Sequence, residues 1–354
     1  MLNKQLHISK INISVIIKRD DKMKIMLTGA AGNVGLETLK CLISNKHDVT
    51  VLELPNKKNR QRLKPFCKLV KIIYGSINDE RLVKRLVDGQ DAIIHLAAII
   101  PPLADRLPKL TEQVNFEGTK NIIEAIKTQE KMPTLIFSSS ISVYGDRVAN
   151  CWIKVGDPLK PSVGDHYAQI KIKTEELIQN SMIPYVIFRL TGIMGYPATD
   201  PLMFHMPLAT KIEFASNVDT GFAFSEALDH LAELEGHIYD LGGGAKFRIT
   251  YQAFLNKMLS IYGLDYRYLN DQAFADQNFH CAYFADSDVL NDILHFQRDD
   301  LNSYYQRVKA KTNPLIKMIN RLLSRPIIYF LQNRSEPLQA KKQNNKELIK
   351  RFYK

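Results

Sequence analysis

A tyrosine and a lysine four residues apart are the first groups in this sequence that could carry out proton chemistry. Tyr167 and Lys171 bound the segment YAQIK, and the spacing i, i+4 places both side chains on one face of a helix. A free tyrosine ionises at about pH 10, so it is a poor base unless a cation such as Lys171 favours its phenolate form. Such a pair also occurs on ordinary helix faces, so the spacing alone leaves both interpretations open.

A run of three serines supplies hydroxyl groups for the same chemistry. Ser138, Ser139 and Ser140 lie in the segment FSSSISVYG, where a predicted strand over residues 135–138 ends. The carboxyl ends of parallel strands face the ligand crevice of a doubly wound sheet. The serine hydroxyls are therefore expected to point into that crevice. A polar strand end that only leads into a turn is the simpler alternative.

A glycine-rich turn predicts a cradle for a dinucleotide. Residues 28–35 read TGAAGNVG, directly after one predicted strand and at the start of a predicted helix. Gly29 permits a tight turn, Gly32 lets the backbone approach a pyrophosphate, and Gly35 lets helix and strand pack closely. The N–H groups at the helix start, those of Asn33 and Val34, would face the phosphates.

Glu53 bears on the choice between NAD and NADP. It ends the second predicted strand, eighteen residues beyond Gly35. A carboxylate at this place accepts hydrogen bonds from the ribose hydroxyls and repels a 2′-phosphate, which favours NAD. The cations at Lys57, Lys58, Arg60 and Arg62 could instead reach such a phosphate. We interpret them as part of a solvated loop.

The elements that must position these groups alternate between strands and helices, which indicates a doubly wound parallel α/β sheet. The predicted strands cover residues 24–28, 49–53, 70–74, 92–96, 135–138 and 185–189, and the predicted helices cover residues 34–45, 79–87, 110–128 and 166–180. Beyond Arg189 we expect a smaller, mixed part that contacts the substrate. This part is predicted to contain strands at residues 211–214 and 237–241 and a helix at residues 251–262, with Thr250 as its N-cap.

Taken together, these motifs resemble the extended short-chain dehydrogenase/reductases, the NAD-dependent epimerase/dehydratase family. The resemblance covers residues 24 to 308. It includes the glycine turn and YxxxK, together with HLAA at residues 95–98, VNFEGTKN at residues 114–121, FRLTG at residues 188–192 and YDLGGG at residues 239–244. It implies a Rossmann domain over residues 23–190, a substrate-binding part over residues 191–308, and NAD as the cofactor, with NADP as the weaker alternative.

The resemblance also implies a role for each matching residue. Ser140, Tyr167 and Lys171 match the family's catalytic triad, and Asn115 matches the asparagine that supports the site. The remaining positions expected along the cofactor are Leu96, Ala97, Ala98, Ser138, Ser76 and Ile77.

Several positions depart from the family pattern. Ser76 stands where an aspartate usually contacts adenine, which weakens that contact or shifts it to the backbone of Ile77. The segment TGIMGYP at residues 191–197 replaces the usual asparagine-containing pattern where nucleotide-sugar recognition begins. This departure puts the substrate in doubt more than the chemistry.

Three functions remain open at this point. A sugar-nucleotide epimerase would re-reduce its ketone intermediate, whereas a dehydrogenase or reductase of another carbonyl compound would release it. Dehydration is disfavoured because Ile141 and Ser142 replace the acidic pair of the family's dehydratases. A protein that binds the dinucleotide without turnover commonly loses the tyrosine or the lysine, and both are present here. A small-molecule substrate and a homodimer are expected, the latter by analogy.

The charge of the chain is concentrated near its end. Residues 301–354 contain thirteen Lys or Arg residues and two Glu residues, which accounts for the whole net charge of +11. A nucleic-acid partner is therefore not expected, because such a protein carries its basic stripe on the folded domain. Residues 309–354 are predicted to form a basic amphipathic tail that Pro326 interrupts. This tail is either a docked helix with a frayed end or a contact for anionic lipid or another partner.

The remaining features exclude several classes of protein. The sequence contains no run of eighteen apolar residues, the length that a membrane-spanning helix needs. Its four cysteines show neither metal-ligand spacing nor a disulfide framework. No metal site is predicted. Residues 1–22 lack the pattern of a secretory signal. We expect them to be a disordered extension, or the product of an upstream start codon, in a cytoplasmic protein.

Overall fold

A seven-stranded parallel sheet forms the centre of the protein. The computed structural model describes residues 22–195 and 201–354, so most of the expected extension at residues 1–22 lies outside the described residues. The strand order is β10-β7-β5-β4-β1-β2-β3, and every pair in this sheet is parallel. The strands are β1 (Lys24–Thr28), β2 (Asp48–Glu53), β3 (Lys71–Tyr74), β4 (Ala92–His95), β5 (Thr134–Ser140), β7 (Tyr185–Leu190) and β10 (His237–Leu241).

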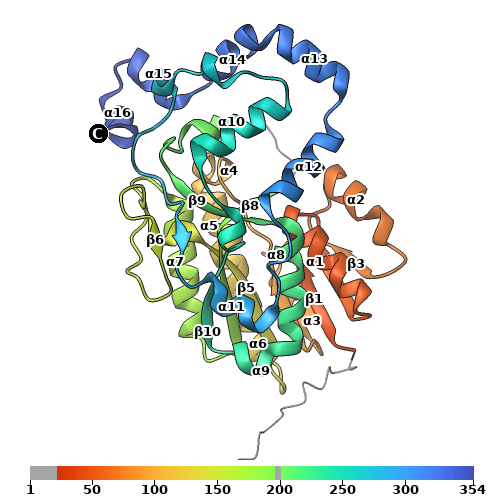
Figure 1. Ribbon diagram of the computed structural model, residues 1–354. Helices are drawn as coiled ribbons and strands as arrows, with labels where there is room; N and C mark the ends of the chain where they lie inside the picture. The colour runs from red at the N-terminus through yellow and green to blue at the C-terminus, as the bar shows by residue number, and fades with distance from the viewer. Residues whose placement is uncertain (1–21, 196–200) are drawn as a thin grey trace, which may run out of the picture.

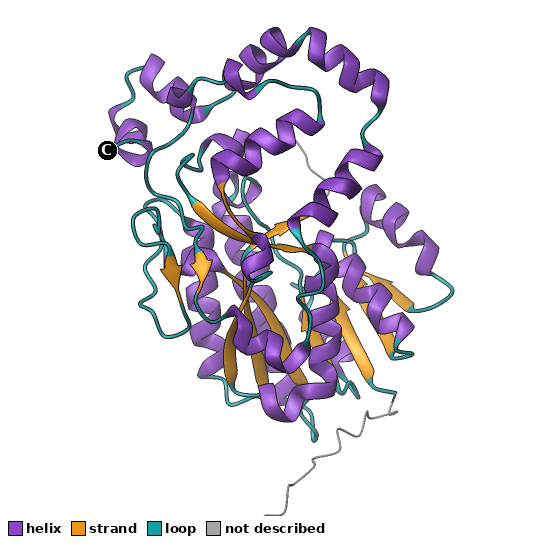
Figure 2. Cartoon of the chain, viewed as in Figure 1, coloured by secondary structure: helices purple, strands orange, loops and turns teal. Residues whose placement is uncertain are grey.

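Helices cover both faces of this sheet, as Figures 1 and 2 show. One face packs on α1 (Asn33–Ser44), α8 (Asn217–Glu226) and α11 (Ser287–Leu294), and the other packs on α3 (Glu80–Val87), α6 (Gly118–Lys127) and α7 (His166–Gln179). Alternate strand residues serve the two faces: Ile25 and Leu27 join the first core, and Met26 joins the second. The predicted doubly wound α/β class is confirmed.

The strand order reverses between β1 and β4, and this fixes where a ligand can lie. The chain runs outward from β1 through β2 to β3, then returns to place β4 on the other side of β1. The connections on either side of this point leave the sheet in opposite directions, which opens a crevice beyond the strand ends. The glycine turn and the three serines both lie at this edge, after β1 and at the end of β5.

The assignment of residues 237–241 to the smaller part was wrong. This segment is β10, which pairs with β7 as an edge strand of the main sheet. The connection from β7 passes through β9 (Lys211–Ser216), α8 and α9 (Leu231–Leu234) before it returns. Within that connection Phe224 packs edge-on against Phe188 of β7, with ring centroids 5.2 Å apart. The sequence predicted six strands in the main sheet, and the seventh was assigned elsewhere because a long connection separates β10 from β7.

The helix expected over residues 110–128 is interrupted. It consists of α5 (Pro108–Glu112), a π-helical turn at Gln113–Glu117, and α6. Asn115 lies in the π turn, a conformation that is frequent at functional sites. The other predicted helices match α1, α3 and α7 to within two residues at each end.

The smaller part consists of short strands and helices above the sheet edge. β9 pairs with β8 (Gly192–Met194) and with β11 (Arg248–Thr250), and β6 (Trp152–Ile153) pairs with β12 (Tyr283–Phe284). Thr250 caps α10 (Tyr251–Ile261) as predicted, since its side chain accepts from the Ala253 N–H. The remaining helices are α2 (Lys57–Leu63), α4 (Leu103–Arg106), α12 (Leu301–Lys311), α13 (Pro314–Leu322), α14 (Ser324–Gln332), α15 (Glu336–Lys342) and α16 (Lys346–Phe352).

The last four helices arch over the smaller part in Figure 1. α13 ends before Pro326, which falls in the first turn of α14, where a missing N–H costs no helical hydrogen bond. Within residues 22–195 and 201–354, no helix is long and apolar enough to cross a membrane.

A buried ion pair joins α7 to the sheet. The guanidinium of Arg189, on β7, donates to Glu175, on α7, with its closest contact at 2.6 Å. Arg189 also donates to the Tyr144 hydroxyl (2.8 Å), which donates to Asp240 on β10 (2.9 Å). Ser139 donates a further hydrogen bond to Glu175. One network therefore connects β5, β7, β10 and α7.

Replacing Arg189 by methionine tests this network. The R189M variant leaves Glu175 as a buried carboxylate without its cation, so we expect the free energy of unfolding to fall by about 3–5 kcal/mol. Urea denaturation measures it. The double variant Arg189→Met, Glu175→Met removes both charges and should lose less than the sum of the two single variants. Additive losses would contradict this coupling.

Candidate functional site

The glycine turn after β1 can be built only from glycine at two positions. Gly29 has a φ of +72°, and a Cβ there would lie 2.6 Å from the Ala97 backbone nitrogen. A Cβ at Gly35 would overlap the Gly29 carbonyl oxygen. The end of β1 thus lies directly against the segment that follows β4, and α1 begins against the turn.

The start of α1 presents free backbone donors. Its N-cap is Gly32, so no side chain accepts from the first turn. The first N–H groups of a helix lack intrahelical acceptors and favour an anion. Gly32, Asn33, Val34 and Gly35 line the adjoining cavity. These residues fit a diphosphate, because the cradle has backbone donors and carries no side chain at Gly29, Gly32 and Gly35.

Glu53 is held against the glycine turn at the end of β2. Its carboxylate accepts from the backbone N–H of Ala31 (2.9 Å) and Leu54 (3.0 Å), and from the side chain of Asn59 (2.9 Å). Of the nearby cations, Arg60 donates to the Pro55 carbonyl (3.2 Å) and lies 4.1 Å from the Tyr74 ring centroid. The carboxylate is therefore fixed beside the cradle, and Arg60 is bound elsewhere.

Ser140, Tyr167 and Lys171 meet at the carboxyl end of β5. The hydroxyl of Tyr167 hydrogen-bonds to Ser140. Lys171 Nζ donates to the Ser138 carbonyl at 2.6 Å and lies 5.8 Å from the Tyr167 ring centroid. All three side chains line one cavity. The helical spacing and the strand end thus bring the predicted triad together.

Burial controls the proton affinities of this triad. It lowers the pKa of Lys171 to about 7, and the Glu175 carboxylate partly offsets that shift. Burial also raises the pKa of Tyr167; Asp165 adds to the rise, and the hydrogen bond with Ser140 opposes it. The pKa of Tyr167 therefore lies above its ordinary value and not below it, because burial disfavours the charged phenolate. Tyr167 therefore holds its proton at neutral pH.

Asn115 and His95 hold the segment that faces the glycine turn. The Asn115 amide accepts from the Ile99 N–H and donates to the Ile99 carbonyl, both at 2.8 Å. His95 is buried, which lowers its pKa to about 3, so it is a neutral partner of Thr28 (2.6 Å). Thr28 accepts from the Ala97 N–H at 3.2 Å. Asn115 therefore positions residues 96–99 and does not itself line the cavity.

The cavity at this edge has a volume of about 650 Å³ and extends beyond the cradle and the triad. The predicted residues that line it are Gly29, Gly32, Asn33, Val34, Gly35, Leu96, Ala98, Ser138, Ser140, Tyr167 and Lys171. The other predicted residues lie outside its lining: Glu53, Ser76, Ile77, Ala97 and Asn115. Of these, Ser76 caps a local turn by accepting from the Asn78 N–H at 3.1 Å.

The far half of the cavity contains residues that the sequence did not single out. They are Asp105, Asp165, His205, His280, Arg351 and Phe352. Asp165 caps α7 through the Ala168 N–H (2.9 Å) and lies 3.5 Å from His280. Because Asp165 lies two residues before Tyr167, the sequence could have identified it as a residue of the cavity.

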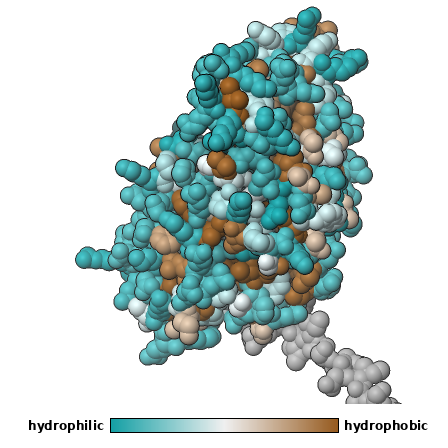
Figure 3. All heavy atoms as spheres, turned by 90° about the vertical axis from the view of Figure 1, so that its left-hand side faces the viewer, coloured by the Kyte–Doolittle hydropathy of each residue, from teal (hydrophilic) through white to brown (hydrophobic). Residues whose placement is uncertain are grey.

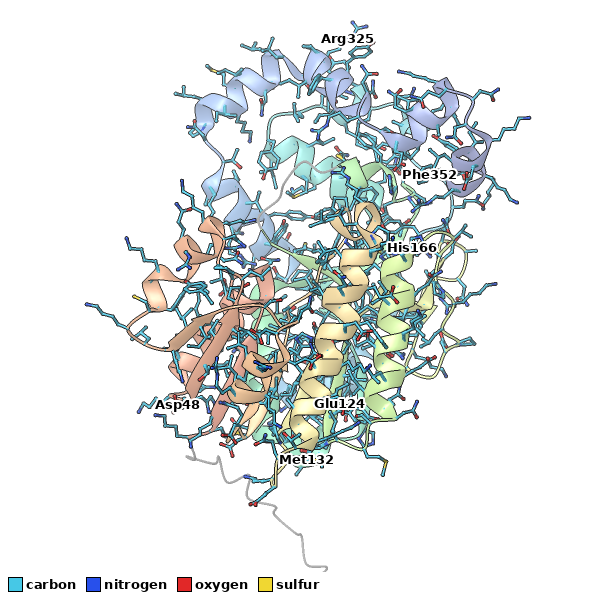
Figure 4. All side chains as sticks on the ribbon, turned by 180° about the vertical axis from the view of Figure 1, so that it is seen from behind. Asp48, Glu124, Met132, His166, Arg325 and Phe352 are labelled. Carbon is cyan, nitrogen blue, oxygen red and sulfur yellow. The ribbon has the colours of Figure 1, made fainter. Side chains whose placement is uncertain are left out.

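The C-terminal helix completes this half. Phe352 is buried and packs on His205, with ring centroids 4.8 Å apart, and His205 pairs with Glu336 at 2.9 Å. The Phe352 carbonyl accepts from the Asp276 N–H at 2.9 Å. In Figure 4 Phe352 lies close to the start of α7, which His166 marks. No local motif connects residues 351 and 352 with Tyr167, so no sequence pattern could have identified them as cavity residues.

Arg351 is a cation that lines this cavity and interacts at a distance with the carboxylates of Asp105, Asp165 and Glu336. Within the described residues its guanidinium makes no hydrogen bond or ion pair, and it lies 5.4 Å from the Phe352 ring centroid. By contrast, His205 pairs with Glu336, and Lys171 donates to a carbonyl.

Residues 22–195 and 201–354 contain no cluster of three His, Cys, Asp or Glu side chains suited to a metal ion.

This chain is similar in sequence and in fold to known proteins. Residues 25–212 match the model of the NAD dependent epimerase/dehydratase family. The chain is 32% identical over 127 residues to the UDP-N-acetyl-alpha-D-glucosaminuronate decarboxylase of Bacillus cytotoxicus, an alignment that covers 35% of this chain and 38% of that protein. It is also 32% identical over 132 residues to the D-erythronate dehydrogenase of Haemophilus influenzae, covering 35% and 39%. The chain thus matches less than half the length of these relatives.

Solved structures share the fold at low sequence identity. DesIV, a dTDP-glucose 4,6-dehydratase from Streptomyces venezuelae solved with NAD and TYD bound, has a TM-score of 0.68 and 20% identity; the match covers 86% of this chain and 99% of that one. Pal from Bacillus thuringiensis has a TM-score of 0.67 and 21% identity, with coverage of 81% and 98%.

The low pKa of Lys171 predicts a pH dependence of stability. Between the folded pKa of about 7 and the usual value of 10.5, the unfolded chain binds one proton more than the folded protein. The free energy of unfolding should therefore rise with pH in this window, by roughly 1 kcal/mol per pH unit from this group. Urea denaturation from about pH 7.5 to 9.5 measures the slope. Lys171→Met should remove that part of the slope, whereas the exposed Lys173→Met should keep it; equal slopes in both variants would contradict the assignment.

Proposed function

The chain belongs to the NAD-dependent epimerase/dehydratase family, and from that premise we propose that it is an NAD-dependent oxidoreductase or epimerase of an anionic sugar derivative. The reaction takes place at a hydroxyl or carbonyl carbon, and a nucleotide sugar is the favoured substrate. The observation that carries this proposal is the meeting of Ser140, Tyr167 and Lys171 in one cavity with the glycine cradle.

The cradle residues hold the cofactor in this proposal. The free N–H groups of α1 bind the diphosphate, and Gly29 and Gly35 leave it room. Glu53, fixed at the turn, receives the ribose hydroxyls and disfavours a 2′-phosphate. When NAD is bound, its nicotinamide would exchange a hydride with the substrate carbon. Leu96 and Ala98 border the same space, and Ser76 and Ile77 remain the predicted adenine-side contacts.

The triad moves a proton at the substrate oxygen. Tyr167 holds its proton at neutral pH, so its hydroxyl can donate to a carbonyl oxygen as that group is reduced. Ser140 orients the same oxygen through its hydroxyl. In the oxidative direction the transfer runs in reverse: the substrate hydroxyl gives its proton to the Tyr167 phenolate, the form that a protonated Lys171 stabilises. Because the pKa of Lys171 is about 7, its charge changes across neutral pH.

Arg351 supports an anionic substrate. Its guanidinium faces the cavity without a hydrogen bond or ion pair among the described residues, and arginine binds carboxylates and phosphates in a bidentate manner. Burial and the neighbouring Asp165 raise the pKa of Asp105, which weakens one of the negative charges that act on Arg351. The names of both curated relatives denote acidic sugar derivatives, one of them attached to UDP.

A dehydrogenase or reductase of a small hydroxy acid is the second candidate. The relative that oxidises D-erythronate favours it, because that compound carries no nucleotide. Absorbance of NADH separates the two candidates: a dehydrogenase gives a lasting change after substrate is added, whereas an epimerase gives none. The homodimer expected by analogy stays a prediction.

Tyr167→Phe tests the chemical role. The variant keeps the ring but loses the proton donor, so we expect turnover to fall by about 10²- to 10⁴-fold. NAD binding, measured by calorimetry, should stay within a few-fold of the wild type. The matched change Tyr268→Phe, at a half-exposed tyrosine outside the cavity, should leave both quantities unchanged. Product analysis with a panel of nucleotide sugars and hydroxy acids provides the assay. Wild-type turnover by Tyr167→Phe would refute the assigned role.

Arg351→Gln tests the substrate class. Losing one charge-assisted hydrogen bond should raise the KM of the anionic substrate by about 10- to 100-fold while kcat and NAD affinity change little. Lys346→Gln on the same helix is the control, because Lys346 is exposed and does not line the cavity. An unchanged KM would show that Arg351 does not bind the substrate.

A further inference from the structure

The helices α13 and α14 expose a row of large apolar side chains. On α13 and its last turn they are Leu315, Ile316, Met318, Ile319, Leu322 and Leu323, with exposed fractions between 49% and 78%. On α14 Tyr329 and Phe330 follow, at 63% and 67%. We call these eight residues the apolar stripe. Scattered exposed apolar residues are common on proteins, but a contiguous patch of this kind marks an interaction site.

The stripe faces outward because these helices dock through other side chains. Asn320 donates to the Tyr262 carbonyl (2.9 Å), and Ser324 accepts from the Asp265 N–H (2.7 Å). Ile328 is fully buried at the next turn. Residues 320, 324 and 328 follow the spacing i, i+4, i+8 and define the docked side. A surface helix ordinarily turns its apolar face toward the core, and α13 does the reverse.

The charge around the stripe has one sign. Residues 301–335 contain seven Lys or Arg residues and no Asp or Glu. Lys317, Arg321 and Arg325 lie on α13 and α14 themselves. Figure 1 places α13 at the outer end of the molecule, away from the main sheet. Figure 3, viewed from the side that carries α15 and α16, shows a largely hydrophilic surface with hydrophobic patches between the polar side chains.

We infer that the apolar stripe lies on the surface of an anionic lipid bilayer. Apolar side chains enter the boundary between headgroups and acyl chains, and the cations on the same helices attract acidic headgroups. A second copy of the chain is disfavoured as the occupant, because it would bring two segments of seven cations together. This contact goes beyond the proposed catalytic function and uses no residue of the cavity.

Vesicle sedimentation with the full-length chain tests this inference. We expect the protein to bind vesicles of phosphatidylcholine with phosphatidylglycerol on the order of 30-fold more tightly than vesicles of phosphatidylcholine alone, since the two exposed helix cations, Arg321 and Arg325, contribute. Raising the salt concentration should weaken this binding, because salt screens exposed charges.

Substitutions separate the stripe from the rest of the surface. Ile319→Gln with Leu322→Gln should lower binding at least tenfold, and Arg321→Gln with Arg325→Gln should abolish the preference for anionic vesicles. The control is Val289→Gln, an exposed apolar residue on α11, which should bind like the wild type. Substitution is preferred to truncation because Arg351 and Phe352 line the cavity.

Three results would overturn the inference. The first is an absence of vesicle binding by the wild type, and the second is vesicle binding that does not change in the Ile319→Gln, Leu322→Gln variant. The third is a wild-type dimer in analytical ultracentrifugation that the same variant converts to a monomer, which would make a second copy the occupant. Thermal unfolding of each variant shows whether it is folded.

Discussion

The contact between the glycine turn and the segment after β4 is the constraint on which the site depends. Gly29 lies against the Ala97 backbone, and Thr28 links the two segments through His95 and the Ala97 N–H. This contact holds the ends of β1 and β4 together at the point where the strand order reverses. The cavity opens beside them, so the cradle and the serines of β5 border the same space. A side chain at Gly29 would separate these parts.

The helix α7 connects the proposed chemistry to the core of the fold. Tyr167, Lys171 and Glu175 follow one another at four-residue intervals along a single face. The first two reach the cavity, and the third binds Arg189 of β7 and Ser139 of β5. The buried ion pair thus fixes the helix that presents the tyrosine. The carboxylate of Glu175 also raises the proton affinity of Lys171, so one residue affects both the rigidity and the charge of the site.

The sequence predicted the parts of the site that local rules determine. The glycine turn, the i, i+4 pair and the strand-end serines each depend on a few consecutive residues, and all of them line the cavity. Long connections obscured the rest. β10 returns to the main sheet more than forty residues after β7, a pairing that no local pattern specifies. Arg351 and Phe352 reach the cavity only because α16 docks on residues 272–276, where Tyr353 donates to the Gln272 carbonyl at 2.8 Å.

The distribution of charge follows from this docking. The net charge of +11 resides in residues 301–354, but its cations lie in two different settings. Arg351 faces the cavity, where partial burial strengthens its attraction for an anion. Arg321 and Arg325 are exposed on the outer helices, where salt screens them beyond roughly 10 Å. A stretch that appears in the sequence as one basic tail therefore divides into an inner group suited to a small anionic substrate and an outer group suited to a charged surface. The buried packing of Phe352 and the exposure of the apolar stripe follow the same division.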